Sequence, residues 1–219
     1  SHCREIWKRQ LDDTMWSSPA VGDIDGDGRP EVIVGGGHFY NRSDGHKVFA
    51  WHLDDGSSLP GWPVATSGST MPSPALGDLN GNGVPELVVS SGDGWVRAFN
   101  GNGSVKWATH LWHFTPQQPG GPVASPIIAD MNGDGHNDVA AGNDFAYFVM
   151  NGVNGAIMTI IDTYESHDSA GAVADFGSGV GWRLIVAGFN TPNHTSRLQS
   201  YSIPAPRTKA PWPMFRRDA

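Results

Sequence analysis

The residues with the clearest chemistry are three clusters of oxygen-bearing side chains. In the first cluster, carboxylates and glycines alternate through GDIDGDGRPE, residues 22–31. Like charges this close repel one another unless a cation lies among them. The candidate ligand positions are every second residue of each cluster: Asp23, Asp25, Asp27, Arg29 and Glu31 in the first, Asp78, Asn80, Asn82, Val84 and Glu86 in the second, and Asp130, Asn132, Asp134, His136 and Asp138 in the third.

The ligand types in these loops favour calcium. Ca²⁺ takes about six to eight oxygen ligands, and side chains at the first, third and fifth positions can wrap it together with a backbone carbonyl at the seventh. Glycines follow the third and fifth positions and leave room for sharp bends. The soft ligands of zinc, copper and iron–sulfur centres are missing, and Mg²⁺ prefers to keep several waters. The sequence therefore predicts three Ca²⁺ sites.

The charge balance supports bound cations. The formal net charge is −8, from 14 Lys and Arg against 22 Asp and Glu. Three calcium ions would bring this balance to about −2, and by carboxylate count the affinity should fall from the first loop to the third and then the second. The same acidic balance argues against a nucleic-acid surface and against docking on anionic lipid.

The acidic loops belong to a longer repeat. Related segments begin near residues 17, 72, 124 and 169, and each reads as a short strand, a loop and a second strand, followed by two further strands in all but the last. Units of this length with four antiparallel strands are typical of β-propeller blades, so we expect an all-β propeller over residues 1–206. A Pro-rich tail, residues 207–219, follows. The fourth repeat has glycines at two ligand positions and Arg183 at the ninth, which predicts a metal-free loop.

The N-terminal segment, residues 3–11, reads as an isolated strand. It precedes the first repeat, whereas the last repeat lacks a fourth strand. We therefore expect residues 3–11 to complete the fourth blade and close a ring of four blades, which would remove exposed sheet edges. The alternative is that the chain is a segment of a larger ring.

Three copies of one motif carry a family resemblance: SPAVGDIDGDGRPEVIVG, SPALGDLNGNGVPELVVS and SPIIADMNGDGHNDVAAG. They resemble the FG-GAP and VCBS-type repeats, which build the integrin alpha-subunit propeller and many secreted bacterial and archaeal propellers. The resemblance implies calcium-stabilised blades, an extracellular setting, and roles in adhesion, glycan binding or support of secreted enzymes. The Phe-Gly and Gly-Ala-Pro signatures of integrins are not clearly present, so no integrin ligand site is expected.

Catalysis has little support in the sequence. The segment ESHD, residues 165–168, has the composition of a triad, but adjacent residues in an extended segment point to opposite faces. His110 and His113 also fall on opposite faces of a strand. We expect no catalytic residue, and we expect the histidines to lie at the surface or to pack between blades.

Binding candidates lie in the longest irregular connection, residues 110–121. Long loops on a rigid scaffold often carry binding residues, and Trp112 and Phe114 are the candidate contacts. Three asparagines fit the glycosylation acceptor pattern: Asn41, Asn102 and Asn193.

Association with other copies has two candidate elements. Cys3 is the one cysteine, so no disulfide can form within the chain, and either Cys3 or the tail could mediate self-association. No apolar run approaches the roughly 18 residues of a membrane span, and no uncleaved secretion signal is present.

Taken together, these features predict a non-catalytic, secreted or cell-surface propeller for adhesion or for binding an extracellular glycan or protein. One alternative is an accessory module of a secreted carbohydrate-active enzyme. Another is a structural subunit of a cell-surface polymer or filament.

Overall fold

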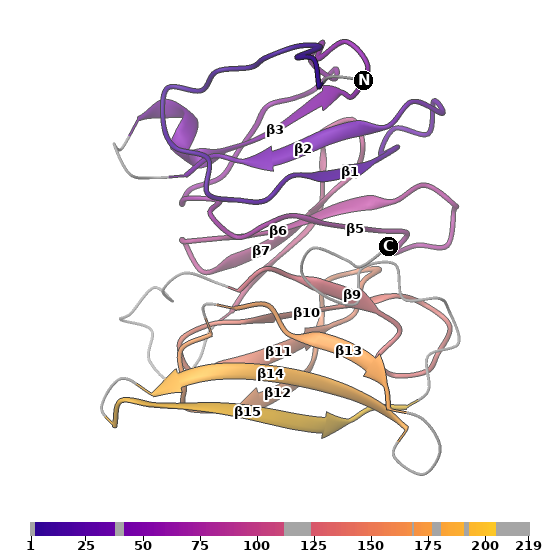
Figure 1. Cartoon of the computed structure of the whole chain (residues 1–219). Coiled ribbons are helices and arrows are strands. Elements are labelled where there is room, and N and C mark those ends of the chain that lie inside the picture. The colour runs from indigo at the N-terminus through magenta and orange to yellow at the C-terminus, as the bar shows by residue number, and fades with distance from the viewer. Residues whose placement is uncertain are drawn as a thin grey trace.

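The computed structural model of the chain is an all-β fold (Figure 1). It describes residues 3–37, 42–111, 124–167, 169–176, 181–190 and 193–204. Within these ranges the chain has no α-helix, and η1 (Ser43–His46) is a single 3₁₀ turn. Accordingly, none of the described helices could span a membrane.

Four antiparallel sheets follow one another along the chain, and we call them blades 1 to 4. Blade 1 contains β1 (Ala20–Gly22), β2 (Glu31–Gly35), β3 (Lys47–His52) and β4 (Val64–Ala65). Blade 2 contains β5 (Ala75–Gly77), β6 (Glu86–Ser91), β7 (Trp95–Phe99) and β8 (Val105–His110). Blade 3 contains β9 (Ile127–Ala129), β10 (Asp138–Gly142), β11 (Ala146–Met150) and β12 (Ile157–Asp162). Blade 4 contains β13 (Ala172–Asp175), β14 (Trp182–Asn190) and β15 (Thr195–Ser202).

The order of strands within each sheet is the order along the chain, so every blade is a simple meander. The acidic loop joins the first two strands of a blade. In blade 1, Gly22 pairs with Glu31 directly across the base of this loop. In blades 2 and 3 the corresponding pairs are Gly77 with Glu86 and Ala129 with Asp138. The repeat in the sequence is therefore also a repeat in the register of the first two strands of each blade.

Apolar side chains on both faces of the strands stack the blades in chain order. Separate cores fill the spaces between blades 1 and 2, blades 2 and 3, and blades 3 and 4. The innermost strands of consecutive blades, β1 and β5, β5 and β9, and β9 and β13, lie against one another. A strand buried on both faces reads as a continuous apolar run, which explains LVV at residues 87–89.

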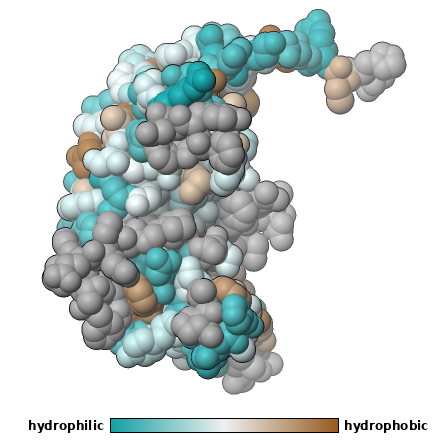
Figure 2. All heavy atoms as spheres, turned by 90° about the vertical axis from the view of Figure 1, so that its left-hand side faces the viewer, coloured by the Kyte–Doolittle hydropathy of each residue, from teal (hydrophilic) through white to brown (hydrophobic). Residues whose placement is uncertain are grey.

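The four blades form an open arc. Blade 1 and blade 4 lie at opposite ends of the stack in Figure 1, and Figure 2 shows this stack turned by 90° about the vertical axis. The closed ring that the sequence favours is therefore not formed by the described residues.

The prediction that residues 3–11 complete blade 4 is wrong for this structure. These residues form no strand and lie on blade 1, where Trp7 Nε1 donates to the Leu53 carbonyl (2.8 Å) and Arg9 Nε to the Gly56 carbonyl (2.7 Å). Leu11 packs against an apolar cluster on the outer face of the same blade. Blade 1 thus offers an apolar face close by, whereas blade 4, with three strands, lies at the far end. The tail, residues 207–219, falls outside the described residues.

Candidate metal centres

All three acidic loops have the same local conformation, which their first aspartate fixes. Asp23 accepts hydrogen bonds from the backbone N–H groups of Gly26 (2.7 Å) and Gly28 (2.8 Å). Asp78 and Asp130 accept the equivalent bonds in the other loops. Gly26 and Gly28 have φ values of 79° and 89°, which residues with a side chain rarely adopt. Each loop is therefore wrapped around its first carboxylate.

The third and fifth positions continue this turn. Asp25 accepts from the N–H of Asp27 (3.1 Å), and Asp27 accepts from the N–H of Arg29 (2.7 Å). The other two loops repeat both bonds. In the first loop, ligand atoms of Asp23, Asp25 and Asp27 all lie within 4.8 Å of one another. A bound cation would offset the repulsion between these carboxylates.

The seventh position contributes only its backbone to this arrangement. The Arg29 guanidinium turns away and donates to both carboxylate oxygens of Asp54 (2.8 Å each). The Val84 side chain has no ligand atom, and the His136 N–H is bound to Asp134 (2.8 Å). A backbone carbonyl is thus the ligand that this position offers, as the loop pattern predicts.

The ninth position ties each loop to the second strand of its blade. This carboxylate is buried in all three loops and accepts a hydrogen bond from the N–H of the second loop residue. The pairs are Ile24 with Glu31 (3.0 Å), Leu79 with Glu86 (2.8 Å) and Met131 with Asp138 (3.0 Å). What distinguishes the loops is the partner of the second carboxylate oxygen.

In the first two loops another side chain occupies that second oxygen. Glu31 lies 3.0 Å from His52 Nδ1, and burial raises the pKa of the Glu31 carboxyl. Glu86 forms an ion pair with Lys106 (2.9 Å) and also accepts from the Asn80 amide. Sequence reasoning missed His52 and Lys106, because both lie on later strands of the blade.

In the third loop the second oxygen has no partner. Asp138 is fully buried, and its Oδ1 makes no hydrogen bond. Burial, together with the nearby carboxylates of Asp134 and Asp130, raises the pKa of Asp138 from 3.8 to about 6. An unpaired buried carboxylate is costly unless a cation compensates it. The third loop therefore fits a bound cation, which would supply the missing partner.

The fourth loop follows β13 and starts at Asp175, while residues 177–180 lie outside the described part of the chain. Arg183, at the ninth position, donates to the Trp182 carbonyl (2.9 Å) and to Ser202 Oγ (3.1 Å). A guanidinium at this position repels a cation, so the metal-free loop stays our prediction.

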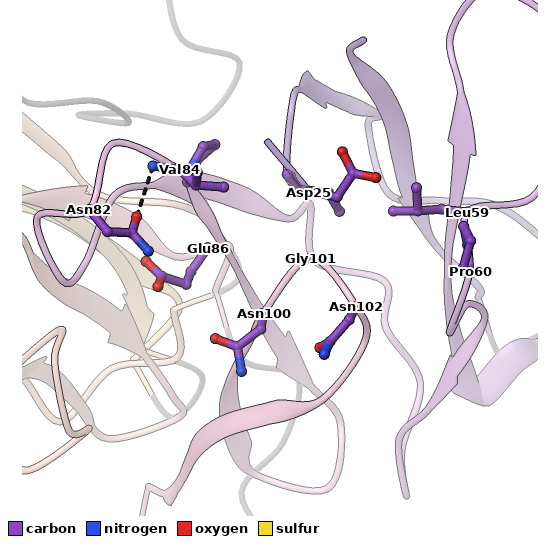
Figure 3. Close-up of a pocket in the computed structure, with 11 residues that line it drawn as sticks. Asp25, Leu59, Pro60, Asn82, Val84, Glu86, Asn100, Gly101 and Asn102 are labelled. Carbon is purple, nitrogen blue, oxygen red and sulfur yellow. Dashed lines mark hydrogen bonds between the residues drawn. The ribbon is translucent and has the colours of Figure 1, made fainter. Parts of the chain in front are cut away.

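A pocket of about 370 Å³ lies beside the first two loops (Figure 3). Asp25 enters it from the first loop, and Asn82 and Glu86 enter it from the second. Asn100 and Asn102, on the turn between β7 and β8, line another side. Its remaining lining includes Leu59, Pro60 and Val84. This pocket could not be predicted from the sequence, because its residues come from two blades.

The other predicted binding residues have mixed outcomes. Trp112, Phe114 and Asn41 lie outside the described residues. Asn102 and Asn193 are exposed, so their use as glycosylation acceptors stays a prediction. Cys3 is free and exposed.

The segment ESHD does not form a relay in the part of the chain that the structure describes. His167 is buried, with Nε2 at 2.6 Å from Thr163 Oγ1 and Nδ1 at 2.8 Å from the Ala187 carbonyl. Both ring nitrogens are thus occupied, and Ser166 Oγ donates to Asp144 instead (2.9 Å). Asp168 lies outside the described residues.

Comparison with known proteins agrees with the loops and the fold. The model of the FG-GAP repeat matches residues 15–51, and that of the FG-GAP-like repeat matches residues 78–141. No curated protein matches the sequence.

Several solved structures share the fold at low sequence identity. BamB from Moraxella catarrhalis is 16% identical with a TM-score of 0.50, over 88% of this chain and 55% of that one. BBS1N, solved in complex with ARL6DN, is 15% identical with a TM-score of 0.59, over 92% of this chain and 61% of that one. The C-terminal domain of Pseudomonas aeruginosa PilY1 is 18% identical with a TM-score of 0.57, over 78% of this chain and 44% of that one.

These likenesses concern the fold alone, and this chain spans between 44% and 61% of the length of those three proteins. The fold and its repeated loops define a β-propeller protein. With the two family matches, the chain is an FG-GAP repeat β-propeller.

Proposed function

We propose that this chain is a non-catalytic, extracellular, calcium-stabilised module that binds glycans or proteins. The FG-GAP propeller fold itself suggests a non-enzymatic binding module. The observation that carries the calcium proposal is the buried, unpartnered Oδ1 of Asp138. It lies in a loop whose other ligand positions carry Asp130, Asn132 and Asp134.

Calcium would be held by alternating oxygens of each loop, and the ion would supply charge neutralisation. The first loop offers the most carboxylates and has three of them already close together. In the second loop, Lys106 already neutralises Glu86, so this site should bind calcium most weakly. Because the ninth residue starts the second strand of its blade, each ion would fasten two strands.

The pocket between blades 1 and 2 is the proposed binding site. Amides of Asn82, Asn100 and Asn102 and the carboxylate of Asp25 offer both donors and acceptors beside an apolar wall, while the Glu86 carboxylate is already bound to Lys106. Such a lining suits a hydroxyl-rich ligand, as in a glycan, whose polar groups each need a partner. Both carboxylates belong to acidic loops, so the pocket has no separate pair for acid–base catalysis. This favours a binding role over catalysis in the pocket.

An extracellular setting agrees with the proposed sites. Extracellular modules use calcium sites of low affinity, and loops that contain asparagine ligands have a low charge count. A single cysteine cannot form a disulfide within the chain, so the chain requires neither an oxidising nor a reducing compartment.

Glycan-array screening, followed by calorimetry with the glycans that bind, tests the binding proposal. The double variant Asn100→Ala/Asn102→Ala should lose binding at least about tenfold, because two polar partners are removed from the pocket. Asn154→Ala, in an exposed turn of blade 3, is the matched control and should bind like the wild type. Unchanged binding by the double variant would exclude the pocket. An array without any binder would leave proteins as the remaining ligand class, to be tested with the same variants.

A further inference from the structure

Two junctions between blades are filled by a tryptophan beside the outer strand. Trp62, just before β4 of blade 1, donates from Nε1 to the Gly101 carbonyl of blade 2 (2.7 Å). Trp107, on β8 of blade 2, donates in the same way to the Gly152 carbonyl of blade 3 (2.7 Å). Both tryptophans are 7% exposed and belong to the apolar cores of their junctions. An indole is therefore the group that fills this space, with its ring among apolar side chains and its N–H on a carbonyl of the next blade.

The carbonyl that accepts this hydrogen bond has an equivalent in blade 4. In blade 1 the acceptor is the Leu53 carbonyl, to which Trp7 Nε1 donates (2.8 Å). The Leu53 N–H donates in turn to the carbonyl of Pro30, the residue before the ninth loop position (2.9 Å). Blade 4 repeats this second bond, from the Ile203 N–H to the Trp182 carbonyl (3.2 Å). Ile203 therefore carries the equivalent carbonyl in blade 4.

In blade 3, a threonine stands at the position of the tryptophan. Trp107 pairs with Ala98, beside a point where the register of β7 and β8 shifts. Thr159 pairs with Val149, beside the same shift between β11 and β12, so Trp107 and Thr159 hold equivalent positions. Thr159 is exposed, whereas Trp107 is buried. A threonine side chain is too short to fill the space of an indole or to reach Ile203 in the next blade.

A pocket of about 410 Å³ lies in the junction between blades 3 and 4. Thr159 and Ile203 both line it, so the pocket lies where the other junctions hold the indole and its acceptor. Ile161 from blade 3 and Leu184 from blade 4 provide apolar walls. The volume falls in the range of small-molecule sites, roughly 300–1,000 Å³.

The polar character of the pocket restricts what it can bind. Because the Ile203 N–H is bound as the Leu53 N–H is, the Ile203 carbonyl should face the preceding blade as the Leu53 carbonyl does. Among the described residues, no group donates to the Ile203 carbonyl. None of the described residues that line the pocket is charged. A ligand that fits should therefore be neutral and should bring a hydrogen-bond donor.

We propose that this pocket binds a free, neutral aromatic molecule with a ring N–H, of the indole class. The ring takes the place that Trp62 and Trp107 fill in the other two junctions, and its N–H donates to the Ile203 carbonyl. This site is separate from the proposed glycan pocket, because the two pockets share no lining residue.

Two tryptophans of the chain, Trp112 and Trp212, lie outside the described residues and are another source of an indole. Trp212 follows Ser202 by as many residues as Trp62 follows His52. Since Trp62 belongs to the outer segment of its own blade, this spacing predicts that Trp212 belongs to the outer segment of blade 4 and not to that of blade 3. The spacing therefore favours a ligand that is not part of the chain.

Calorimetric titration of the full-length chain with indole and with benzofuran tests the proposal. Benzofuran has nearly the shape of indole but carries an oxygen in place of the N–H. Indole should bind at one site per chain, and benzofuran should bind about tenfold more weakly, because it leaves the Ile203 carbonyl without a donor. Absence of saturable indole binding, or equal affinity for the two molecules, would overturn the proposal.

A variant that fills the pocket gives a second test. Thr159→Trp should place an indole where Trp107 has one in blade 2, abolish indole binding and raise the urea midpoint. Val105→Trp is the matched control and should bind indole like the wild type, since Val105 is also exposed on an outer strand but does not line the pocket. Indole binding that survives in folded Thr159→Trp would overturn the proposal. The comparison of indole with benzofuran needs no variant, so it decides the question even if Thr159→Trp does not fold.

The variants Trp112→Ala and Trp212→Ala test whether the chain fills its own pocket. Both should bind indole like the wild type. Binding at least about tenfold tighter in either variant would show that the chain's own tryptophan competes for the pocket, and would overturn the proposal of a free ligand. The double variant Asn100→Ala/Asn102→Ala should leave indole binding unchanged, so failure of the glycan site and failure of this site are measured independently.

Discussion

Replacing Asp138 by asparagine should stabilise the metal-free protein and should reduce the stabilisation that calcium provides. Its pKa in the folded protein is about 6 against an ordinary value of 3.8, because the carboxyl is buried and lies near other carboxylates. A difference of about two pKa units corresponds to about 3 kcal/mol, by which the ionised group destabilises the metal-free fold at pH 7. Asp138→Asn keeps an oxygen for the Met131 N–H and removes the charge, so it should stabilise the chelated protein by about 1–3 kcal/mol.

Calcium should stabilise the Asp138→Asn variant much less than the wild type. At a free calcium concentration of about 100 times the dissociation constant, one site adds about 2.7 kcal/mol to the free energy of unfolding. The variant should lose most of this increment at the third loop. Urea denaturation at pH 7, with calcium and with a chelator, measures both effects.

The matched control for this experiment is Asp175→Asn, in the loop that we predict to be metal-free. Calcium should raise the free energy of unfolding of this variant by the same amount as that of the wild type. Equal destabilisation by Asp138→Asn in both conditions would show that the carboxylate has a structural role without a metal, and would refute a calcium site at the third loop.

Three further predictions use the same denaturation assay. In the chelated protein, the stabilisation by Asp138→Asn should shrink as the pH falls, from about 1–3 kcal/mol at pH 7 to under about 1 kcal/mol near pH 4, because protonation removes the cost of burying a carboxyl with a raised pKa. A difference that stays constant with pH would contradict this. Lys106→Met leaves buried Glu86 without its cation and should cost about 3 kcal/mol in chelator, part of which calcium restores; a loss that calcium does not reduce would exclude a metal at the second loop. Trp107→Phe removes the hydrogen bond to the Gly152 carbonyl and should cost about 1 kcal/mol, a value that an unchanged urea midpoint would disprove.

Much of the fold could be predicted from the sequence, because repeat and strand patterns are local. The alternation of oxygen-bearing residues with glycines predicted the loops, and the apolar runs on either side predicted the strands that flank them. For example, the strand expected after Pro30 is β2 (Glu31–Gly35).

The relation between distant elements could not be predicted in the same way. Residues 3–11 look like a strand without a partner, but the sequence does not say on which blade they lie. That depends on the apolar face of blade 1 and on the turn that receives the Trp7 hydrogen bond. Likewise, the difference between the three loops depends on His52 and Lys106, which meet the ninth residue only after the blade has folded.

Crystals grown with calcium offer the most direct test, through an anomalous difference map of the three acidic loops. We predict one ion in each of the first three loops, with oxygens at about 2.3–2.6 Å, and none in the loop that starts at Asp175. Loops that keep the hydrogen bonds described above at millimolar calcium, with no ion beside Asp138, would contradict this prediction.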